Sequence, residues 1–338
     1  MPTPTEDEGL AETPAVVAPA QDSRAREKRE RLLLVAAFAA VYLIWGSTYL
    51  AIVVGLQTLP PLVISACRHS TAGLVFYPLL RWKTGIRPTP AQWKTAAITG
   101  VLLLLMGNGA VCLSEQSVPS GVAALLVAMV SFWMVLLDWL RPGGSKPVPR
   151  VVASLLLGFG GLVLLVGPAH LGGSERVNPF GAGILVVGSF AWACGSIYSK
   201  HNDLPSSPML GVAMQSLFGG AALWTAALLS GEVREFHPAA VSLRSWLAVA
   251  YLVVFGSGIG FTAYVYLLKK STAARVGTYA FVNPVVALFL GWLGAGEGVT
   301  LRTGLAAAVI LTAVLLVITA PHKSTAEAAG TLATPGEA

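Results

Sequence analysis

The sequence contains little charge, which excludes most soluble folds. Asp, Glu, Lys and Arg make up only 11% of its 338 residues, whereas apolar residues make up 55%. A soluble domain usually carries about 25% charged residues. Together with a mean hydropathy of +0.70, this composition places the chain among integral membrane proteins.

The sequence also lacks the residues that a catalytic site needs. Its acidic residues are too scarce for a paired-carboxylate or two-metal site. Cys67, Cys112 and Cys194 lie in apolar runs without metal-ligand spacing, so we interpret them as small buried hydrophobic residues. There is no Walker loop, no His-Glu-x-x-His motif and no Gly-x-Ser-x-Gly elbow. We therefore predict no catalytic residue, no metal site and no cofactor, and neither an enzyme nor an ATP-driven pump.

Long apolar segments follow one another along the chain. A membrane-spanning helix needs about 20 mostly apolar residues. Ten segments meet this criterion, at about 32–54, 60–80, 94–114, 119–140, 149–167, 180–200, 208–229, 246–267, 273–293 and 301–320. Residues 1–31 and 321–338 are predicted to be disordered tails. The basic run that ends the first tail does not indicate a signal peptide, because the apolar run after it exceeds signal-peptide length.

The basic residues predict the orientation. With the N-terminus in the cytoplasm, 17 of the 22 Lys and Arg residues fall in cytoplasmic segments, four fall outside, and Arg68 lies within a helix. This follows the positive-inside rule, so we predict that both termini are cytoplasmic and that the protein lies in the plasma membrane. The same partition explains the net charge of +6 without a nucleic-acid partner.

A polar patch inside the first apolar segment returns in the sixth. Residues 46–49 read Gly-Ser-Thr-Tyr and residues 195–198 read Gly-Ser-Ile-Tyr. Further matches lie at one constant offset of 153, where Ser131, Trp139 and Pro168 match Pro284, Trp292 and Pro321. The chain therefore divides into two five-helix repeats, 32–168 and 180–320. Because five is odd, the second repeat enters the membrane inverted, as in many secondary transporters that bind substrate at the midplane between the halves.

Several motifs resemble a known family. Trp45–Tyr49, Val118–Ala124, Phe281–Val286 and the Gly296-Glu297 pair ahead of the last helix are similar to the EamA-type transporters of the drug/metabolite transporter superfamily. The resemblance implies a ten-helix inner-membrane carrier, often an exporter of amino acids, metabolites or drugs. Ser131 stands where the second repeat has Pro284, so we infer that the halves are not mechanically equivalent.

Arg68 is the charged residue nearest the middle of the membrane. It lies about eight residues into the second segment, roughly 12 Å from the boundary of a core about 30 Å thick. A central Arg costs roughly 2.5–3.5 kcal/mol on insertion scales and should face the bundle interior or water. It could hold a substrate carboxylate or phosphate, or it could be a structural residue capped by carbonyls or by Glu115. Its repeat counterpart is the neutral Gln215, and this asymmetry favours an anionic or zwitterionic substrate.

The other candidate binding residues each have a structural alternative. His69 could carry a proton or could simply pack, and Asn108 could offer an amide to substrate or bond a neighbouring helix. The tryptophans Trp45 and Trp192 could stack on substrate or serve as packing. Asn283 lies beside a proline kink that could line the pathway. The predicted substrate-binding set is Trp45, Arg68, His69, Asn108, Trp192, Gln215 and Asn283.

The repeated patch and the kink supply candidate gate residues. The predicted set is Gly46, Ser47, Tyr49, Gly195, Ser196, Tyr198 and Pro284. We place the first copy of the patch in the outer half of its helix and the second copy in the inner half, on either side of the binding site. Gly256 and Gly260, four residues apart, predict close contact between the eighth helix and a neighbour.

The sequence thus predicts an all-α membrane protein of ten helices in two inverted repeats. Its predicted function is a secondary carrier that exports a small metabolite, amino acid or drug-like molecule by alternating access. The alternatives are an intramembrane enzyme acting on a lipid-linked substrate and a membrane sensor without flux. The partners are a small-molecule substrate and the lipid bilayer. Proton coupling and uncoupled transport both stay open, and no oligomeric state is predicted.

Overall fold

The protein is represented by a computed structural model that describes residues 20–114, 117–118, 120–144, 146–166, 178–295 and 300–320. The chain forms two compact units, residues 1–36 and 37–338. Within the described residues every regular element is helical. The predicted tails at 1–19 and 321–338, Glu115 and the Gly296-Glu297 pair lie outside the described residues.

The first helix begins earlier than predicted. Helix α1 covers Ala20–Leu56, so residues 20–31 are helical rather than disordered. The stretch from 24 to 31 consists mostly of Arg, Lys and Glu, which are strong helix formers. Opposite charges four residues apart, as at Arg26 and Glu30, add further stability on a helix surface. Low apolar content was therefore misinterpreted as disorder.

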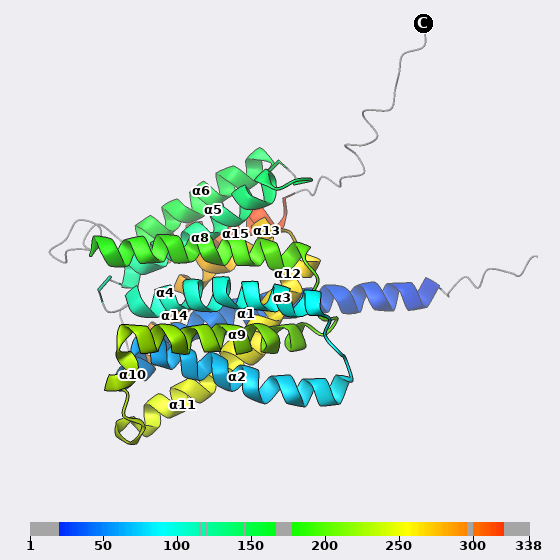
Figure 1. The fold of residues 1–338 in the computed structure, drawn as a ribbon. Coiled ribbons are helices and arrows are strands. Elements are labelled where there is room, and N and C mark those ends of the chain that lie inside the picture. The colour runs from blue at the N-terminus through cyan, green and yellow to red at the C-terminus, as the bar shows by residue number, and fades with distance from the viewer. Residues whose placement is uncertain are drawn as a thin grey trace, which may run out of the picture. The chain divides into compact units, whose positions relative to one another are not determined.

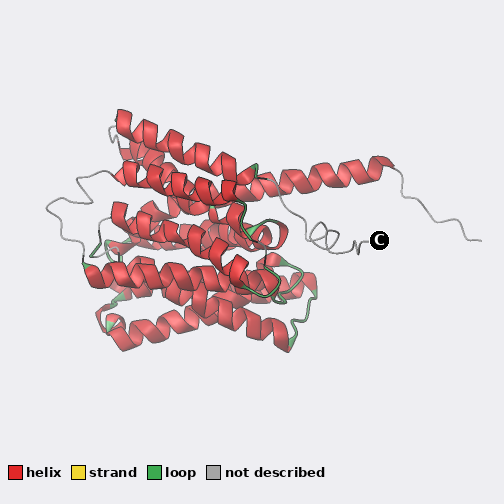
Figure 2. Ribbon diagram, turned by 90° about the horizontal axis from the view of Figure 1, so that it is seen from above, coloured by secondary structure: helices red, strands yellow, loops and turns green. Residues whose placement is uncertain are grey.

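The first half of the second unit continues with helices close to the predicted segments. These are α2 (Pro61–Thr84), the continuous helix formed by α3 (Pro90–Thr99), η1 (Gly100–Asn108) and α4 (Gly109–Ser114), then α5 (Ser120–Leu140) and α6 (Pro149–Val166). The helices lie side by side with their axes roughly aligned, as Figures 1 and 2 show.

The second half repeats this order. Its helices are α8 (Pro179–His201), α9 (Pro208–Ser230), the continuous α11 (Leu243–Tyr251), η3 (Leu252–Gly260) and α12 (Phe261–Lys270), then α13 (Ala273–Gly277), α14 (Tyr279–Ala295) and α15 (Leu301–Ile318). Two short helices, α10 (Glu232–Glu235) and η2 (Pro238–Ala240), connect α9 to α11.

Nine helices of the described chain are long and apolar enough to cross a membrane, against ten predicted. The difference is α2. This helix has 24 residues, but Arg68, His69, Arg81 and Lys83 lower its hydropathy. Its first half is buried and contains Arg68 and His69, and its most extensive packing is against α9. Its second half exposes Leu74, Val75, Leu79 and Trp82, so this part of the helix presents an apolar surface.

The matching helices of the two halves begin and end with the same local chemistry. Both α2 and α9 have proline at the first turn, where its missing N–H costs nothing. Both end at a glycine with positive φ, Gly85 at 66° and Gly231 at 87°. This left-handed conformation closes a helix and is readily adopted only by glycine.

A shared feature that the sequence did not indicate is a π-helical segment in the third helix of each half. The segments η1 and η3 each span nine residues. The helices that contain them begin at Pro90 and Leu243, which differ by the repeat offset of 153. Long π-helical segments are rare and often occur at functional sites, so their duplication directs attention to this part of the bundle.

The two halves are inverted relative to each other. The Glu232 carboxylate, just after the end of α9, accepts the backbone N–H of Leu62 at the start of α2, with a distance of 2.7 Å. A second pair of counterpart helices shows the same arrangement. Arg150 at the start of α6 donates a hydrogen bond to the hydroxyl of Thr319, just after the end of α15, also at 2.7 Å. The counterpart helices α2 and α9 are therefore antiparallel, and so are α6 and α15. The prediction of two inverted repeats is confirmed.

Candidate substrate-binding cavity

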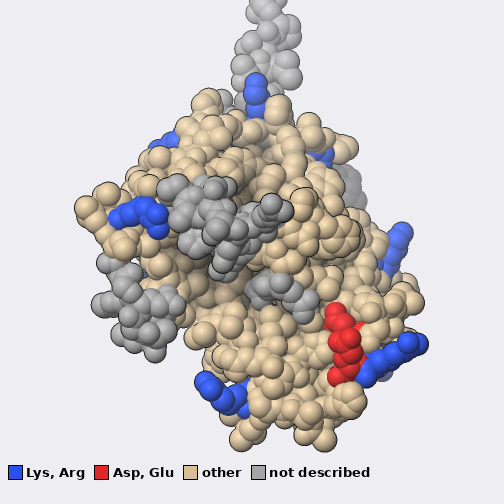
Figure 3. All heavy atoms as spheres, turned by 90° about the vertical axis from the view of Figure 1, so that its left-hand side faces the viewer, with Lys and Arg blue, Asp and Glu red and all other residues tan. Residues whose placement is uncertain are grey.

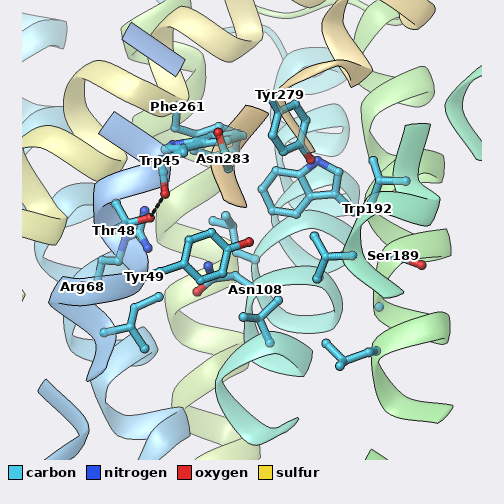
Figure 4. A pocket seen from close by; sticks show the side chains of 18 of the residues that line it. Trp45, Thr48, Tyr49, Arg68, Asn108, Ser189, Trp192, Phe261, Tyr279 and Asn283 are labelled. Carbon is cyan, nitrogen blue, oxygen red and sulfur yellow. Dashed lines mark hydrogen bonds between the residues drawn. The ribbon is translucent and has the colours of Figure 1, made fainter. Parts of the chain in front are cut away.

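A cavity lies between the two halves of the second unit. It contains about 770 Å³ of space without protein atoms, a volume that includes open solvent at its mouth. Its walls come from α1, α2, η1, α4, α5, α8, α12 and α14, and Figure 4 shows the side chains that line it. The labelled lining residues are Trp45, Thr48, Tyr49, Arg68, Asn108, Ser189, Trp192, Phe261, Tyr279 and Asn283.

Arg68 supplies the cavity's positive charge. The side chain is 6% exposed, and its Nε donates a hydrogen bond to Ser257 Oγ at 2.9 Å. Among the described residues no carboxylate lies within ion-pair distance of the guanidinium. The alternative partner that the sequence suggested, Glu115, lies outside the described residues. A buried cation without a described counter-ion is the main electrostatic feature of this site.

A glycine of η3 makes this arrangement possible. A Cβ atom added at Gly256 would lie 2.7 Å from Nη2 of Arg68, so a larger residue would displace the guanidinium. The carbonyl of Gly256 also accepts a hydrogen bond from Nε1 of Trp45 at 3.2 Å. Arg68 and Trp45 belong to the first half, whereas η3 belongs to the second. The second half therefore positions two side chains of the first.

One side of the cavity ends at a cluster of aromatic rings, which we call the aromatic plug. It consists of Trp45, Trp192, Phe261, Tyr264 and Tyr279. The Trp45 ring centroid lies 5.6 Å from that of Trp192, 4.9 Å from that of Tyr264 and 5.1 Å from that of Tyr279. Trp192 Nε1 donates to the Tyr264 hydroxyl at 2.9 Å, which also hydrogen-bonds Ser196. The plug joins both halves through ring contacts and hydrogen bonds.

Two buried side chains of the cavity have polar atoms without a hydrogen bond of standard geometry to the described residues. These atoms are both ring nitrogens of His69, although Asn108 lies close enough to interact with the ring, and Oδ1 of Asn283. Asn108 differs, because its Oδ1 accepts a hydrogen bond from Ser65 Oγ at 3.1 Å. A buried polar atom without a partner costs about 1–3 kcal/mol. A bound molecule or water that pairs with His69 and Asn283 would remove that cost.

The cavity brings together six of the seven predicted binding residues. Trp45, Arg68, His69, Asn108, Trp192 and Asn283 all line it. Gln215 does not. It is fully buried on α9, and its side-chain amide has no hydrogen bond to the described residues. The repeat alignment paired it with Arg68, but the cavity does not extend equally into both halves.

The first copy of the repeated patch lies at the cavity wall. Tyr49 lines the cavity, as does Thr48, which was not in the predicted set. Gly46 faces α14, where an added Cβ would lie 2.6 Å from the side chain of Val286. Ser47 faces away, and its hydroxyl hydrogen-bonds that of Tyr251 at 2.6 Å.

The second copy lies beyond the plug rather than in the cavity wall. Ser196 is fully buried and hydrogen-bonds Tyr264. Gly195 packs against Leu102 and Leu103 of η1. Tyr198 is partly exposed near the end of α8. Pro284 lies within α14, directly after the cavity residue Asn283.

Sequence reasoning missed the residues that hold the site rather than line it. Ser257 is an ordinary serine in an apolar stretch, and nothing in the sequence connects it with Arg68. Gly256 and Gly260 were predicted to allow close contact with a neighbouring helix, and they do. Their contacts are with Arg68 and Trp45, two predicted binding residues. The spacing of the glycines was the one available signal.

Comparison with known proteins identifies the family. The model of the EamA-like transporter family matches residues 32–167 and 179–319, once for each half. The chain belongs to the EamA-like transporter family. It is 38% identical over 290 residues to the uncharacterized inner membrane transporter YedA of Escherichia coli K12, covering 86% of this chain and 92% of that protein.

Two further similarities are more distant. The probable amino-acid metabolite efflux pump of Escherichia coli K12 is 25% identical over 80% of this chain and 90% of its own length. A solved crystal structure shares the fold with a TM-score of 0.68 at 20% identity, covering 90% of this chain and 99% of that one.

Family membership settles the class of protein. The chain is a multi-pass inner-membrane transporter of the drug/metabolite transporter superfamily, and its partners include the lipid bilayer and a transported substrate. The prediction of a transporter is confirmed. The alternative of an intramembrane enzyme is wrong, because members of this family are transporters.

Proposed function

We propose that this transporter is a secondary carrier that binds a small anionic or zwitterionic molecule in the cavity and exports it by alternating access. The observation that carries the proposal is Arg68, a buried cation at the cavity wall without a carboxylate partner in the described structure. The guanidinium presents a planar set of donors that fits a carboxylate or phosphate. A substrate anion would supply the missing counter-charge.

The rest of the cavity suits a molecule that also has an apolar part. Trp45, Trp192 and Tyr279 supply aromatic surface next to the unpartnered Oδ1 of Asn283. Amino acids and related metabolites combine a carboxylate with such a part. The similarity to a probable amino-acid metabolite efflux pump, at 25% identity, supports this class of substrate.

Alternating access is supported by the position of the cavity relative to the plug. On α8 the lining residues Leu185, Gly188 and Ser189 precede Trp192, whereas Ser196, one turn after it, is buried. On α1 the order is reversed, since the lining residues Thr48 and Ile52 follow Trp45. Because α1 and α8 are antiparallel counterparts, both sets of lining residues lie on the same side of the two tryptophans. The cavity therefore extends from the plug toward one end of the bundle only.

That end carries few basic residues. It is the end where α8 begins, and the basic residues described there are Arg234, Arg244 and Arg302. Figure 3 views this end and shows mostly uncharged surface, with acidic side chains gathered in one place and scattered basic ones. By the positive-inside rule we assign it to the outer side. The cavity is then open outward, the plug is closed toward the cytoplasm, and both termini are cytoplasmic.

The test is substrate flux in proteoliposomes with a panel of L-amino acids, monocarboxylates and phosphate monoesters. Arg68→Ala is expected to abolish flux while the protein stays folded, and Arg68→Lys to retain only part of it, since Lys lacks the planar fork. Ser257→Ala removes the hydrogen bond to Nε and should raise KM roughly tenfold with a smaller effect on maximal rate. Undiminished flux with Arg68→Ala would refute the proposal. A pH gradient across the same vesicles distinguishes proton-coupled from uncoupled transport.

A further inference from the structure

The plug tryptophan of the first half rests on a glycine of the second half. A Cβ atom added at Gly260, the last residue of η3, would lie 2.7 Å from Nε1 and 2.9 Å from Cδ1 of Trp45. Real Cβ contacts do not occur below about 3.0 Å, so the indole occupies space that only glycine leaves open. The contact therefore fixes where Trp45 can lie.

The plug tryptophan of the second half rests on a glycine of the first half. A Cβ atom added at Gly107 of η1 would lie 2.6 Å from Cε3 and 3.3 Å from Cβ of Trp192. The two indoles then meet edge to face, at a centroid distance of 5.6 Å and an interplanar angle of 82°. Each tryptophan is held from behind by the opposite half.

The two contacts are equivalent under the inverted repeat. Gly107 and Gly260 differ by 153, which is the offset that relates the helices containing η1 and η3. Both glycines lie in π-helical segments, and both face a tryptophan of the first helix of the other half. Close approach is common among the buried helix glycines, as at Gly73 and Gly219, whereas the exposed Gly160 and Gly183 have no atom within 4 Å of an added Cβ. What distinguishes Gly107 and Gly260 is that the neighbour in each case is a plug tryptophan.

We propose that Gly107 and Gly260 are paired positioning residues that hold the aromatic plug closed. A methyl group at either position must displace an indole ring that is packed on its other side, and overfilling a close-packed interior is unfavourable. Displacing Trp45 also lengthens its hydrogen bond to Gly256, and displacing Trp192 lengthens its bond to Tyr264. The inference rests on the proposed closed state of the plug, but not on the identity of the substrate.

The experiment measures the accessibility of Ser196, which lies directly beyond the plug. The reporter is Ser196→Cys in a variant with Cys67, Cys112 and Cys194 replaced by Ala. A membrane-impermeant maleimide is added to one side or the other of sealed vesicles. Gly107→Ala and Gly260→Ala should raise the labelling rate from the cavity's open side about tenfold, equivalent to roughly 1.4 kcal/mol in the opening equilibrium. Gly160→Ala and Gly183→Ala are the matched controls and should leave the rate unchanged.

A double-mutant cycle separates the steric contact from a general loosening of the fold. Trp192→Phe lacks the atom that corresponds to Cε3, so Gly107→Ala should add little to its labelling rate. Additive effects, or unchanged labelling in folded Gly107→Ala and Gly260→Ala proteins, overturn the inference. If either glycine variant does not fold, the cycle at the other glycine provides the test. For Gly260 the partner variant is Trp45→Ala, which removes both Nε1 and Cδ1. Equal labelling of the parent reporter from both sides instead refutes the closed plug itself.

Discussion

The Tyr264 hydroxyl makes two of the hydrogen bonds within the plug region, and removing it gives a direct measure of their contribution. Tyr264 is fully buried, and its oxygen accepts the indole N–H of Trp192 at 2.9 Å and hydrogen-bonds Ser196. In Tyr264→Phe the Ser196 hydroxyl keeps its bond to the carbonyl of Trp192, whereas the Trp192 N–H loses its partner. Leaving one buried donor unpaired costs about 1–3 kcal/mol.

The matched control is Tyr266→Phe on the same helix. Tyr266 is half-buried, and its hydroxyl makes no hydrogen bond to the described residues. We expect Tyr264→Phe to lower the midpoint of thermal unfolding in detergent by a few degrees relative to Tyr266→Phe. It should also speed labelling of a cysteine at position 196. The reasoning is refuted if the two variants unfold at the same temperature and label at the same rate.

Two further predictions concern the contacts that align the halves. Glu232→Ala removes the acceptor for the first N–H groups of α2 and should destabilise the protein by about 1 kcal/mol. Glu232→Gln should destabilise it less, because the amide oxygen of Gln still accepts. Thermal unfolding of the two variants distinguishes these outcomes. Gly161→Ala places a Cβ 2.8 Å from Ile310 of α15 and should destabilise the protein, whereas the adjacent Gly160→Ala meets open space and should not. Equal midpoints of thermal unfolding would contradict the close packing of α6 on α15.

The helices were predictable because their lengths follow from the bilayer. Starts and stops come from local chemistry, as at Pro61 and Gly85, and these signals survive without tertiary context. The helical stretch 20–31 was missed for the opposite reason, because its stability comes from propensity and charge spacing rather than from apolar content. The π-helical segments could not be predicted, since the same apolar residues satisfy either hydrogen-bond register and packing decides between them.

A residue of the candidate site was predictable where the free-energy cost of placing it in the membrane alone singles it out. Arg68 stood out because a charge in the membrane is expensive without a functional or structural reason. Gln215 was grouped with it through sequence symmetry, but the cavity lies on one side of the plug and therefore breaks that symmetry. Ser257 and Gly256 were not predictable, because their importance depends on which side chains approach them from the other half.

The positions of Arg68 and the plug have a joint consequence for transport. Arg68 and Trp45 both belong to the first half, and both are held by η3 of the second half, through Ser257 and Gly256. A movement of the halves that separates Trp45 from Trp192 must therefore also change the contacts of Arg68 with η3. In the proposed function, a substrate anion would bind the guanidinium that Ser257 orients. In the proposed function, binding at Arg68 and opening of the plug are therefore linked through one short segment, 256–260, so that the plug opens with substrate bound rather than without it.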